Sequence, residues 1–344
     1  MRLFGRVSEK DLLEEFIRSG KKIDKLKLNI NELKQRLTFT DVKKLTTTAI
    51  QNENLGAVLF LAKINKLAVA NVLSTYDFEV TLRKFRNSPQ IPALYFMIRN
   101  ELSKSKRNIF RKLVRASVLK TSLKISGRGL RGTSVKRGEY EPGVDEFDIE
   151  ETLENIIGKD VIERRDIVIF HRTKMKKRGV LILDTSGSMY GPKILNAALA
   201  AAVLAYHMRD DTYSIIVFNN VATVLKKINE RGNINKIIDS ILDTEPVGYT
   251  RIDDALNKAY QELKKLKGPR KWAIIITDGC YNKGNDPIPL AAKFPQLHVI
   301  QIPGGQKWCT QVCMDMAKRG KGRLVSVSKY NEIPRALLKI LRTM

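Results

Sequence analysis

The segment VLILDTSGSMYGPKILNAALAAAVLAYHM, residues 180–208, indicates the fold class most clearly. It begins with an unbroken apolar run, passes through a turn of small polar residues, and continues as a long segment rich in alanine and leucine. A strand that is apolar on both faces is typical of the interior of a parallel sheet, and the segment after it predicts a crossover helix. We therefore expect an α/β domain built around this unit.

Apolar strands alternate with helical segments over the rest of the chain. Strands are predicted at 180–184, 213–218, 221–226, 272–278, 297–302 and 323–327, and helices at 192–209, about 231–242, 252–267, near 310–319 and from about 331. The second and third of these strands form a predicted hairpin across the polar pair Asn219-Asn220. This alternation predicts a doubly wound, mainly parallel sheet with helices on both faces.

The sequence before this domain predicts two further regions. Residues 1–120 space their apolar side chains by three and four, which predicts a helical bundle without a chemical motif. Residues 121–177 are expected to form a glycine-rich basic linker, a short acidic helix ended by Gly158, and a strand at 166–172 that leads into the α/β domain of residues 178–344.

The charge of the chain is strongly positive and unevenly distributed. Its 344 residues contain 62 Lys or Arg and 36 Asp or Glu, a net charge of +26. Residues 1–140 hold 30 basic and 12 acidic residues, residues 141–177 hold 7 and 10, and residues 178–344 hold 25 and 14. Such a charge attracts nucleic acid, anionic lipid or an acidic protein. Because aromatics are only 7% and do not alternate with basic residues, we interpret most of the charge as solvated helical faces.

Three features of the sequence indicate the cellular compartment of the protein. No stretch approaches the roughly 20 apolar residues of a membrane span, and the first residues show no apolar core of a signal peptide. Cys280, Cys309 and Cys313 are too few for a disulfide framework, and an odd count suits a reducing compartment. We expect three free thiols in a cytoplasmic protein, since a zinc or copper site on these cysteines lacks a clear fourth ligand.

Three loops at the ends of predicted strands carry acidic and hydroxyl side chains. The first strand runs into DTSGS, residues 184–188, the strand at 272–278 ends in Asp278, and GYT, residues 248–250, precedes a helix. In a parallel sheet such loops gather at one edge, where the strand order reverses. Carboxylate and hydroxyl oxygens suit Mg²⁺ or a similar cation, and they do not suit zinc or copper.

These loops resemble a known metal site. LILDTSGSM (181–189), GYTRIDDAL (248–256) and IIITDG (274–279), in this order and spacing, are similar to the metal-ion-dependent adhesion site of the von Willebrand factor A (VWA) family. The resemblance covers about residues 178–344 and implies a VWA domain. It implies that one divalent ion, Mg²⁺ or else Mn²⁺ or Ca²⁺, is held by Asp184, Ser186, Ser188, Thr250 and Asp278, the serines and often the threonine directly and the aspartates largely through water.

Two aromatic residues are expected at the rim of this site. Tyr249 departs from the family pattern, which has a small residue before the threonine, and it would offer a partner an aromatic contact. Trp308 is predicted in the loop region after the strand at 297–302, either as a rim contact or as part of the core.

Other interpretations of the same residues are weaker. DTSGS alone would suit an ordinary helix cap, but the three motifs together favour a metal site. Ser186 and Ser188 do not lie in the Gly-x-Ser-x-Gly turn of serine hydrolases, and the three histidines fall outside the site loops. No phosphate-binding loop is present, so the sequence does not predict a nucleotide hydrolase. We expect that the chain is not an enzyme.

Residues 138–160, GEYEPGVDEFDIEETLENIIGKD, also resemble the segment that precedes the VWA domain in CoxE-like proteins. Those proteins are commonly associated with MoxR-type AAA+ ATPases. The resemblance implies an adaptor that binds an exposed Asp or Glu of such an ATPase or of its client, and that helps in protein remodelling or enzyme maturation without a membrane. RNA binding, as in Ro-like proteins, is the alternative, but a helical region of about 120 residues is short for the ring of those proteins.

Overall fold

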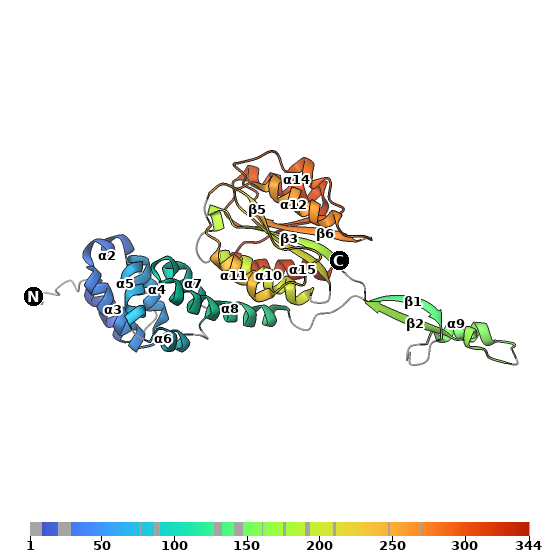
Figure 1. Ribbon diagram of the computed structural model, residues 1–344, viewed down its shortest axis with the longest axis horizontal. Coiled ribbons are helices and arrows are strands. Elements are labelled where there is room, and N and C mark those ends of the chain that lie inside the picture. Colours follow the sequence, from blue (N-terminus) through green and yellow to red (C-terminus); the bar gives the residue numbers. More distant parts are fainter. Residues whose placement is uncertain are drawn as a thin grey trace, which may run out of the picture.

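A six-stranded sheet forms the centre of the carboxyl-terminal half of the chain in the computed structural model (Figure 1). The structure describes residues 9–19, 29–75, 77–85, 88, 90–126, 133–140, 147–159, 161–174, 177–189, 193–208, 211–246, 248–268 and 270–343. The strands are β1 (Thr133–Glu139), β2 (Val168–Lys174), β3 (Arg178–Asp184), β4 (Thr212–Phe218), β5 (Ala222–Lys226), β6 (Lys271–Thr277), β7 (Leu297–Gln301) and β8 (Lys321–Ser326). The amino-terminal helices are α1 (Glu9–Arg18), α2 (Ile30–Arg36), α3 (Phe39–Gln51), α4 (Leu55–Ile64), α5 (Lys66–Thr75), α6 (Phe78–Lys84), α7 (Ile91–Ile98) and α8 (Lys104–Ser126). The later helices are α9 (Ile149–Ile156), α10 (Lys193–His207), α11 (Ile234–Asp243), α12 (Ile252–Lys264), α13 (Ile288–Ala291), α14 (Lys307–Arg319) and α15 (Ile333–Arg342).

The order of the strands in the large sheet is β5-β4-β3-β6-β7-β8. All neighbouring pairs are parallel except β4 and β5, which form the hairpin predicted around Asn219-Asn220. The chain leaves β3 toward β4 on one side and later returns to β6 on the other side. The prediction of a doubly wound, mainly parallel sheet preceded by a helical region is therefore confirmed.

Both faces of the sheet are buried, which explains the unbroken apolar strands. Along β3, Leu181 and Leu183 belong to one hydrophobic cluster, whereas Val180 and Ile182 belong to the other. The first cluster lies under α10, α11 and α15, and the second under α12, α13 and α14. Since strand side chains alternate between faces, a strand between two helical layers must be apolar throughout.

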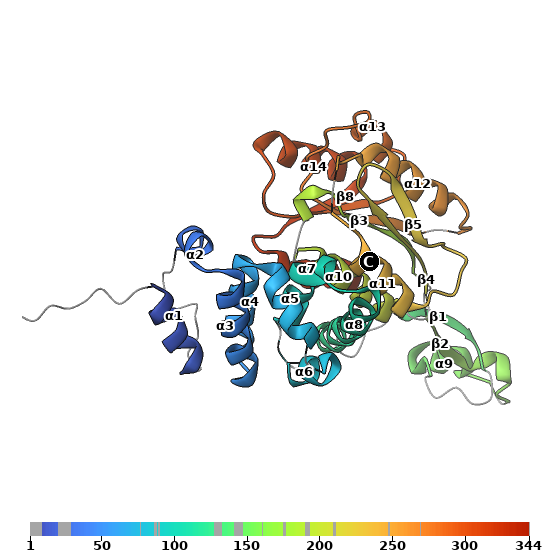
Figure 2. The ribbon, with the colours of Figure 1, turned by 60° about the vertical axis from the view of Figure 1, so that its left-hand side comes forward.

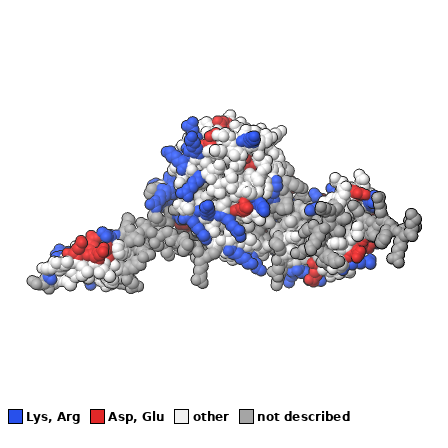
Figure 3. All heavy atoms as spheres, turned by 180° about the vertical axis from the view of Figure 1, so that it is seen from behind, with Lys and Arg blue, Asp and Glu red and all other residues white. Residues whose placement is uncertain are grey.

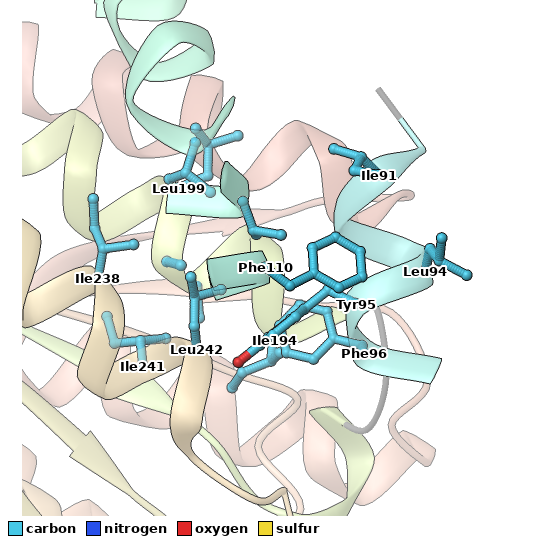
Figure 4. Packing of buried hydrophobic residues seen from close by; sticks show 14 of the residues in the cluster. Ile91, Leu94, Tyr95, Phe96, Phe110, Ile194, Leu199, Ile238, Ile241 and Leu242 are labelled. Atoms are coloured by element: carbon cyan, nitrogen blue, oxygen red, sulfur yellow. The ribbon is translucent and has the colours of Figure 1, made fainter. Parts of the chain in front are cut away.

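The helical region shares its core with the first of these faces. Figure 4 shows side chains of α7 and α8 meeting those of α10 and α11 in one cluster, with Tyr95 and Phe110 near its middle. Both rings are fully buried, and their centroids lie 5.3 Å apart in an edge-to-face arrangement. Burial and the nearby carboxylate of Asp243 raise the pKa of Tyr95 to about 12. The helices of residues 29–126 are thus packed onto the sheet domain.

Charged side chains reinforce the same junction. Arg111 forms ion pairs with Asp239 and Asp243 of α11, and Arg115 forms one with Asp239. The buried Arg99 donates hydrogen bonds to the backbone carbonyl oxygens of Leu242 and Thr244, the latter at 3.0 Å. Part of the positive charge of the helical region therefore stabilises the fold.

Replacing Arg99 by alanine is expected to lower the free energy of unfolding by about 2 kcal/mol, because two carbonyl groups at this junction lose their donor. Urea denaturation measures this change. Arg36→Ala is the matched control: Arg36 is exposed and pairs with Glu32 of its own helix, so a loss of less than about 0.5 kcal/mol is expected. Equal losses in the two variants would contradict a specific role of Arg99.

Residues 133–174 contain the predicted acidic helix, α9, and the predicted strand, β2, but part of the predicted linker is a strand as well. Residues 133–139 form β1, which pairs antiparallel with β2 in a separate two-stranded sheet, and α9 packs beside it. The ion pair of Arg137 with Asp148, at 2.8 Å, ties strand and helix together. We call β1, β2 and residues 147–166 the arm, and Figures 1 and 2 show it projecting from the sheet domain.

Strand β1 was missed because its sequence, TSVKRGE, contains a single apolar residue and therefore shows no strand periodicity. The predicted basic linker also begins later than expected, since residues 121–126 continue α8. In the part of the chain that the structure describes, no helix combines the length and apolar character needed to cross a bilayer.

Candidate metal centre

The three loops singled out in the sequence meet at the carboxyl edge of the sheet. Because β3 and β6 are parallel neighbours with Leu183 opposite Ile276, Asp184 comes to lie beside Thr277, one residue before Asp278. A Cβ atom placed on Gly187 would lie 3.7 Å from the carbonyl oxygen of Gly248, so the loop after β3 also reaches the loop before α12. This is the position in the sheet where the strand order reverses, which is where α/β sheets bind their ligands.

Asp184 is buried at the end of β3 and held in a fixed orientation. Its Oδ1 accepts the backbone N–H of Ser186 at 2.9 Å, and its Oδ2 accepts the hydroxyl of Thr277 at 2.7 Å. Burial raises the pKa of Asp184 to about 6, and the negative charge of Asp278 acts in the same direction. Because the two buried negative charges repel each other, binding of a cation between them would be favourable.

The two serines lie side by side in the loop after β3. The Oγ atoms of Ser186 and Ser188 are 3.2 Å apart, so both hydroxyls are directed to one place. Ser186 is buried, and Ser188 is half-buried. Lys193, in the first turn of α10, donates to the carbonyl oxygen of Ser188 at 3.0 Å and fixes the far end of the loop.

Thr250 is held by a residue that sequence reasoning missed. Its backbone N–H donates to Oδ1 of Asn282 at 2.8 Å, and the N–H of Asn282 donates back to the carbonyl oxygen of Thr250 at 3.2 Å. Asn282 lies in the loop after β6, so this pair joins the threonine loop to the loop of Asp278. The sequence alone does not indicate this role of Asn282, because an asparagine in a polar loop predicts only a turn.

Asp278 is nearly buried, and its Oδ1 accepts the N–H of Cys280 at 2.9 Å. The turn between them depends on Gly279, which has φ +80°. A Cβ atom at this position would lie 2.4 Å from the carbonyl oxygen of Cys309 and 2.5 Å from Sγ of Cys313. Glycine is therefore required both by the backbone conformation and by the close approach of α14.

The cysteines differ from the expectation of three free thiols. Cys280 and Cys309 form a disulfide that joins the loop of Asp278 to the first turn of α14, and Cys313 stays free and buried. Spacing could not reveal this pair, because 29 residues separate the two cysteines and only the fold brings them together. With two sulfurs bonded, a zinc or copper site on the three thiols has no basis, and the odd cysteine count no longer supports a reducing compartment.

We expect one free thiol per chain. Alkylation of the denatured protein without reductant should modify only Cys313, whereas alkylation after treatment with a dithiol should modify all three cysteines. Intact-mass measurement followed by peptide mapping distinguishes these outcomes. Three alkylated cysteines in the unreduced, freshly purified protein would contradict the disulfide.

Exposed aromatic side chains surround the site. Tyr249 and Trp308, the two predicted rim residues, are 56% and 45% exposed, and Trp308 lies in the first turn of α14 rather than in a loop. Two further residues extend the rim: the ring of Tyr281 meets Trp308 edge-to-face at 5.8 Å, and Nζ of Lys283 lies 5.7 Å from the ring of Tyr249. The rim thus combines flat apolar surfaces with positive charge.

The chemistry of the assembled groups fits a hard cation. Two carboxylates and three hydroxyls contribute oxygen only, which suits Mg²⁺, Mn²⁺ or Ca²⁺. Among the described residues no group of three or more His, Cys, Asp or Glu side chains lies close enough to hold a metal, so an ion here would depend on the hydroxyls. His298 lies elsewhere, on β7, where burial lowers its pKa to about 4 and its Nδ1 accepts the N–H of Arg323.

Residues 180–280 match the family model of the von Willebrand factor type A domain. That range contains β3, β6 and all five predicted metal ligands. The sheet order and the helices on both faces agree with this assignment, so the chain contains a VWA domain.

Individual relatives are distant. An uncharacterized protein of Synechocystis sp. is 26% identical over 180 residues, which are 51% of this chain and 43% of that protein, so the match spans less than half of the relative. An aerotolerance-related membrane protein of Bacteroides fragilis is 20% identical with a TM-score of 0.41, over 49% of this chain and 100% of that one. Proximal thread matrix protein 1 of the mussel byssus, solved with zinc in its MIDAS motif, is 16% identical with a TM-score of 0.41, over 48% and 47%.

Proposed function

Because residues 180–280 belong to a VWA domain, a type that commonly mediates protein–protein interactions, we propose that this chain is a metal-dependent protein-binding adaptor and not an enzyme. Asp184, Ser186, Ser188, Thr250 and Asp278 would hold one divalent cation, with Mg²⁺ the first choice. Bound there, the cation would supply a coordination position for a carboxylate oxygen of a partner protein.

The observation that carries the proposal is the facing pair of buried carboxylates beside two converging hydroxyls. Asp184 and Asp278 repel each other at adjacent strand ends, and the Oγ atoms of Ser186 and Ser188 lie 3.2 Å apart next to them. Burial of two like charges is unfavourable unless a positive charge compensates them. A divalent cation supplies that compensation.

The surrounding residues keep these groups in place before a partner arrives. Thr277 orients Asp184, the N–H of Cys280 orients Asp278, and Asn282 holds the backbone of Thr250. Rigid support of this kind lowers the entropy lost on binding. Tyr249 and Trp308 would then contact the residues next to the partner's Asp or Glu, and the positive charge of the chain would speed encounter with an acidic surface.

A MoxR-type AAA+ ATPase, or a client of such an ATPase, is the partner that we propose. The absence of a phosphate-binding loop in the sequence means that any work driven by nucleotide hydrolysis must come from a second protein. The helical region packs against α10 and α11, so it moves with the VWA domain and offers a second contact surface on the same rigid body. RNA remains the alternative partner because of the net charge of +26.

Biolayer interferometry with the MoxR-type ATPase encoded in the same genome tests the proposal. We expect binding in Mg²⁺, loss of binding in EDTA, and recovery when Mg²⁺ is added in excess. A parallel filter assay with single-stranded RNA at two salt concentrations covers the alternative. Binding to the ATPase that persists unchanged in EDTA would contradict the metal-dependent contact, and strong RNA binding with a steep salt dependence in EDTA would favour the alternative.

A further inference from the structure

The arm exposes an apolar stripe that nothing in the described chain covers. In α9 no residue is buried, and Ile149, Leu153 and Ile157 are 68%, 50% and 76% exposed. These residues are four apart, so they lie on one face of the helix and the turn that follows it. Val161 and Ile162, 73% and 56% exposed, add further exposed apolar side chains to the arm. Contiguous apolar patches of this kind mark interaction sites.

Negative charge borders the stripe. Residues 147–166 contain seven Asp or Glu and three Lys or Arg in a chain whose net charge is +26. Glu151 pairs with Arg137 inside the arm, whereas Glu150 and Glu154 are exposed next to the stripe. Figure 3 shows acidic side chains gathered on the arm, in contrast to the basic side chains on the neighbouring face of the sheet domain.

A groove with the complementary character lies between α6 and α8. Its apolar floor and wall consist of Leu82, Ile109, Leu113 and Ala116, and its volume is about 520 Å³. Three basic side chains, Arg83, Lys112 and Lys120, and one acidic side chain, Glu79, stand at its border. Because Glu79 pairs with Arg83, the excess positive charge comes from Lys112 and Lys120. The groove therefore offers aliphatic contacts flanked by positive charge, whereas the arm offers aliphatic side chains flanked by negative charge.

We propose that the arm of one copy of this chain docks into the α6–α8 groove of a second copy. An amphipathic helix that lays its apolar face into a hydrophobic groove is a common recognition mode, and the opposite charges at the border set its orientation. Figure 1 shows α9 at one end of the long axis and α6 on the other side of the sheet domain, so the docking joins two molecules. Reciprocal exchange of both arms closes a two-fold dimer, in which each stripe and each groove is covered.

The dimer is independent of the metal centre, because neither the arm nor the groove contains a predicted metal ligand. Size-exclusion chromatography with light scattering of the full chain in EDTA is therefore expected to give twice the 39.1 kDa of one chain. A monomeric protein would contradict the dimer but not the proposed metal-dependent adaptor. Partner binding that does not depend on metal would contradict the adaptor but not the dimer.

Charge reversal tests the two surfaces together. Glu150→Lys with Glu154→Lys on the arm, or Lys112→Glu with Lys120→Glu at the groove, is expected to weaken dimerisation at least tenfold. An equal mixture of the two variants should dimerise again, because each normal arm meets a normal groove and each reversed arm meets a reversed groove. Restoration in the mixture requires direct contact, since two damaged folds would not repair each other.

A control for the groove variant makes the same change in net charge at another place. Lys63→Glu with Lys66→Glu lies on α4 and α5, outside the groove, and should leave the dimer intact. Thermal unfolding of every variant monitors folding. The proposal is overturned by a wild-type protein that stays monomeric at about 100 µM, by a dimer that neither reversal weakens, or by a mixture that stays monomeric although both variants fold.

Discussion

Asp184→Ala is expected to abolish metal-dependent binding, with at least a 100-fold loss of affinity for Mn²⁺ and a matching loss of affinity for the protein partner. Asp184 is the centre of the proposed site: it accepts hydrogen bonds from Thr277 on β6 and Ser186 in its own loop, and the charge of Asp278 raises its pKa. Removing it deletes half of the negative charge that compensates the cation. Because the variant removes the repulsion between Asp184 and Asp278, and Asp184 forms no ion pair with any residue that the structure describes, the fold should survive.

Asp254→Asn is the matched control for this variant, since it removes one negative charge from the same region. Asp254 lies on α12 four residues after Thr250, but its carboxylate accepts the N–H of Ala222 and pairs with Lys258. Isothermal titration with Mn²⁺ and interferometry with the ATPase should show normal affinity for Asp254→Asn. If both variants lose affinity equally, the effect comes from net charge and the assignment of Asp184 is wrong.

Asp184→Asn is expected to stabilise the metal-free protein at neutral pH by about 3 kcal/mol, although it removes metal binding. Burial and Asp278 raise the pKa of Asp184 from 3.8 to about 6, so the charged form is disfavoured in the folded state. The difference between these pKa values corresponds to about 3 kcal/mol at pH 7. Asparagine has no charge and keeps an oxygen that accepts the N–H of Ser186.

The pH dependence of this gain follows from proton linkage. Between about pH 6 and 4 the folded wild type binds a proton at Asp184 that the unfolded chain does not bind, so acidification stabilises the wild type. The advantage of Asp184→Asn should therefore be full above pH 7 and nearly absent at pH 4. Urea denaturation in EDTA at the two pH values measures it. A variant that is less stable than the wild type at pH 7.5, or a difference that does not change with pH, would contradict the buried charge.

The sequence predicts the sheet and the site loops because both depend on local patterns. The apolar run of residues 180–184, followed by DTSGS, specifies a buried strand and the turn after it, and this turn lies at the predicted edge of the sheet. The same holds for Asp278, which follows the apolar strand β6. These parts were predictable because the hydrophobic pattern locates the ends of the strands, and the topology of a parallel sheet brings those ends to one edge.

The remaining features depend on contacts between segments that are far apart. The loop after β6 must first pack against α12 and α14. Only then can Cys280 bond to Cys309 and Asn282 form hydrogen bonds with Thr250. The arm is a third case, because β1 is polar and becomes a strand through its pairing with β2 alone. No hydrophobic periodicity marks a polar strand, a loop asparagine or a single cysteine pair, so a sequence pattern cannot predict them.

Anomalous X-ray diffraction from a crystal grown with Mn²⁺ would locate the cation in the protein. We predict one strong anomalous peak per chain at the carboxyl edge of the sheet, in contact with the hydroxyl oxygens of Ser186 and Ser188 and next to Thr250, Asp184 and Asp278. No peak at this edge in a crystal with an intact fold, or a single peak bound by other residues, would contradict it.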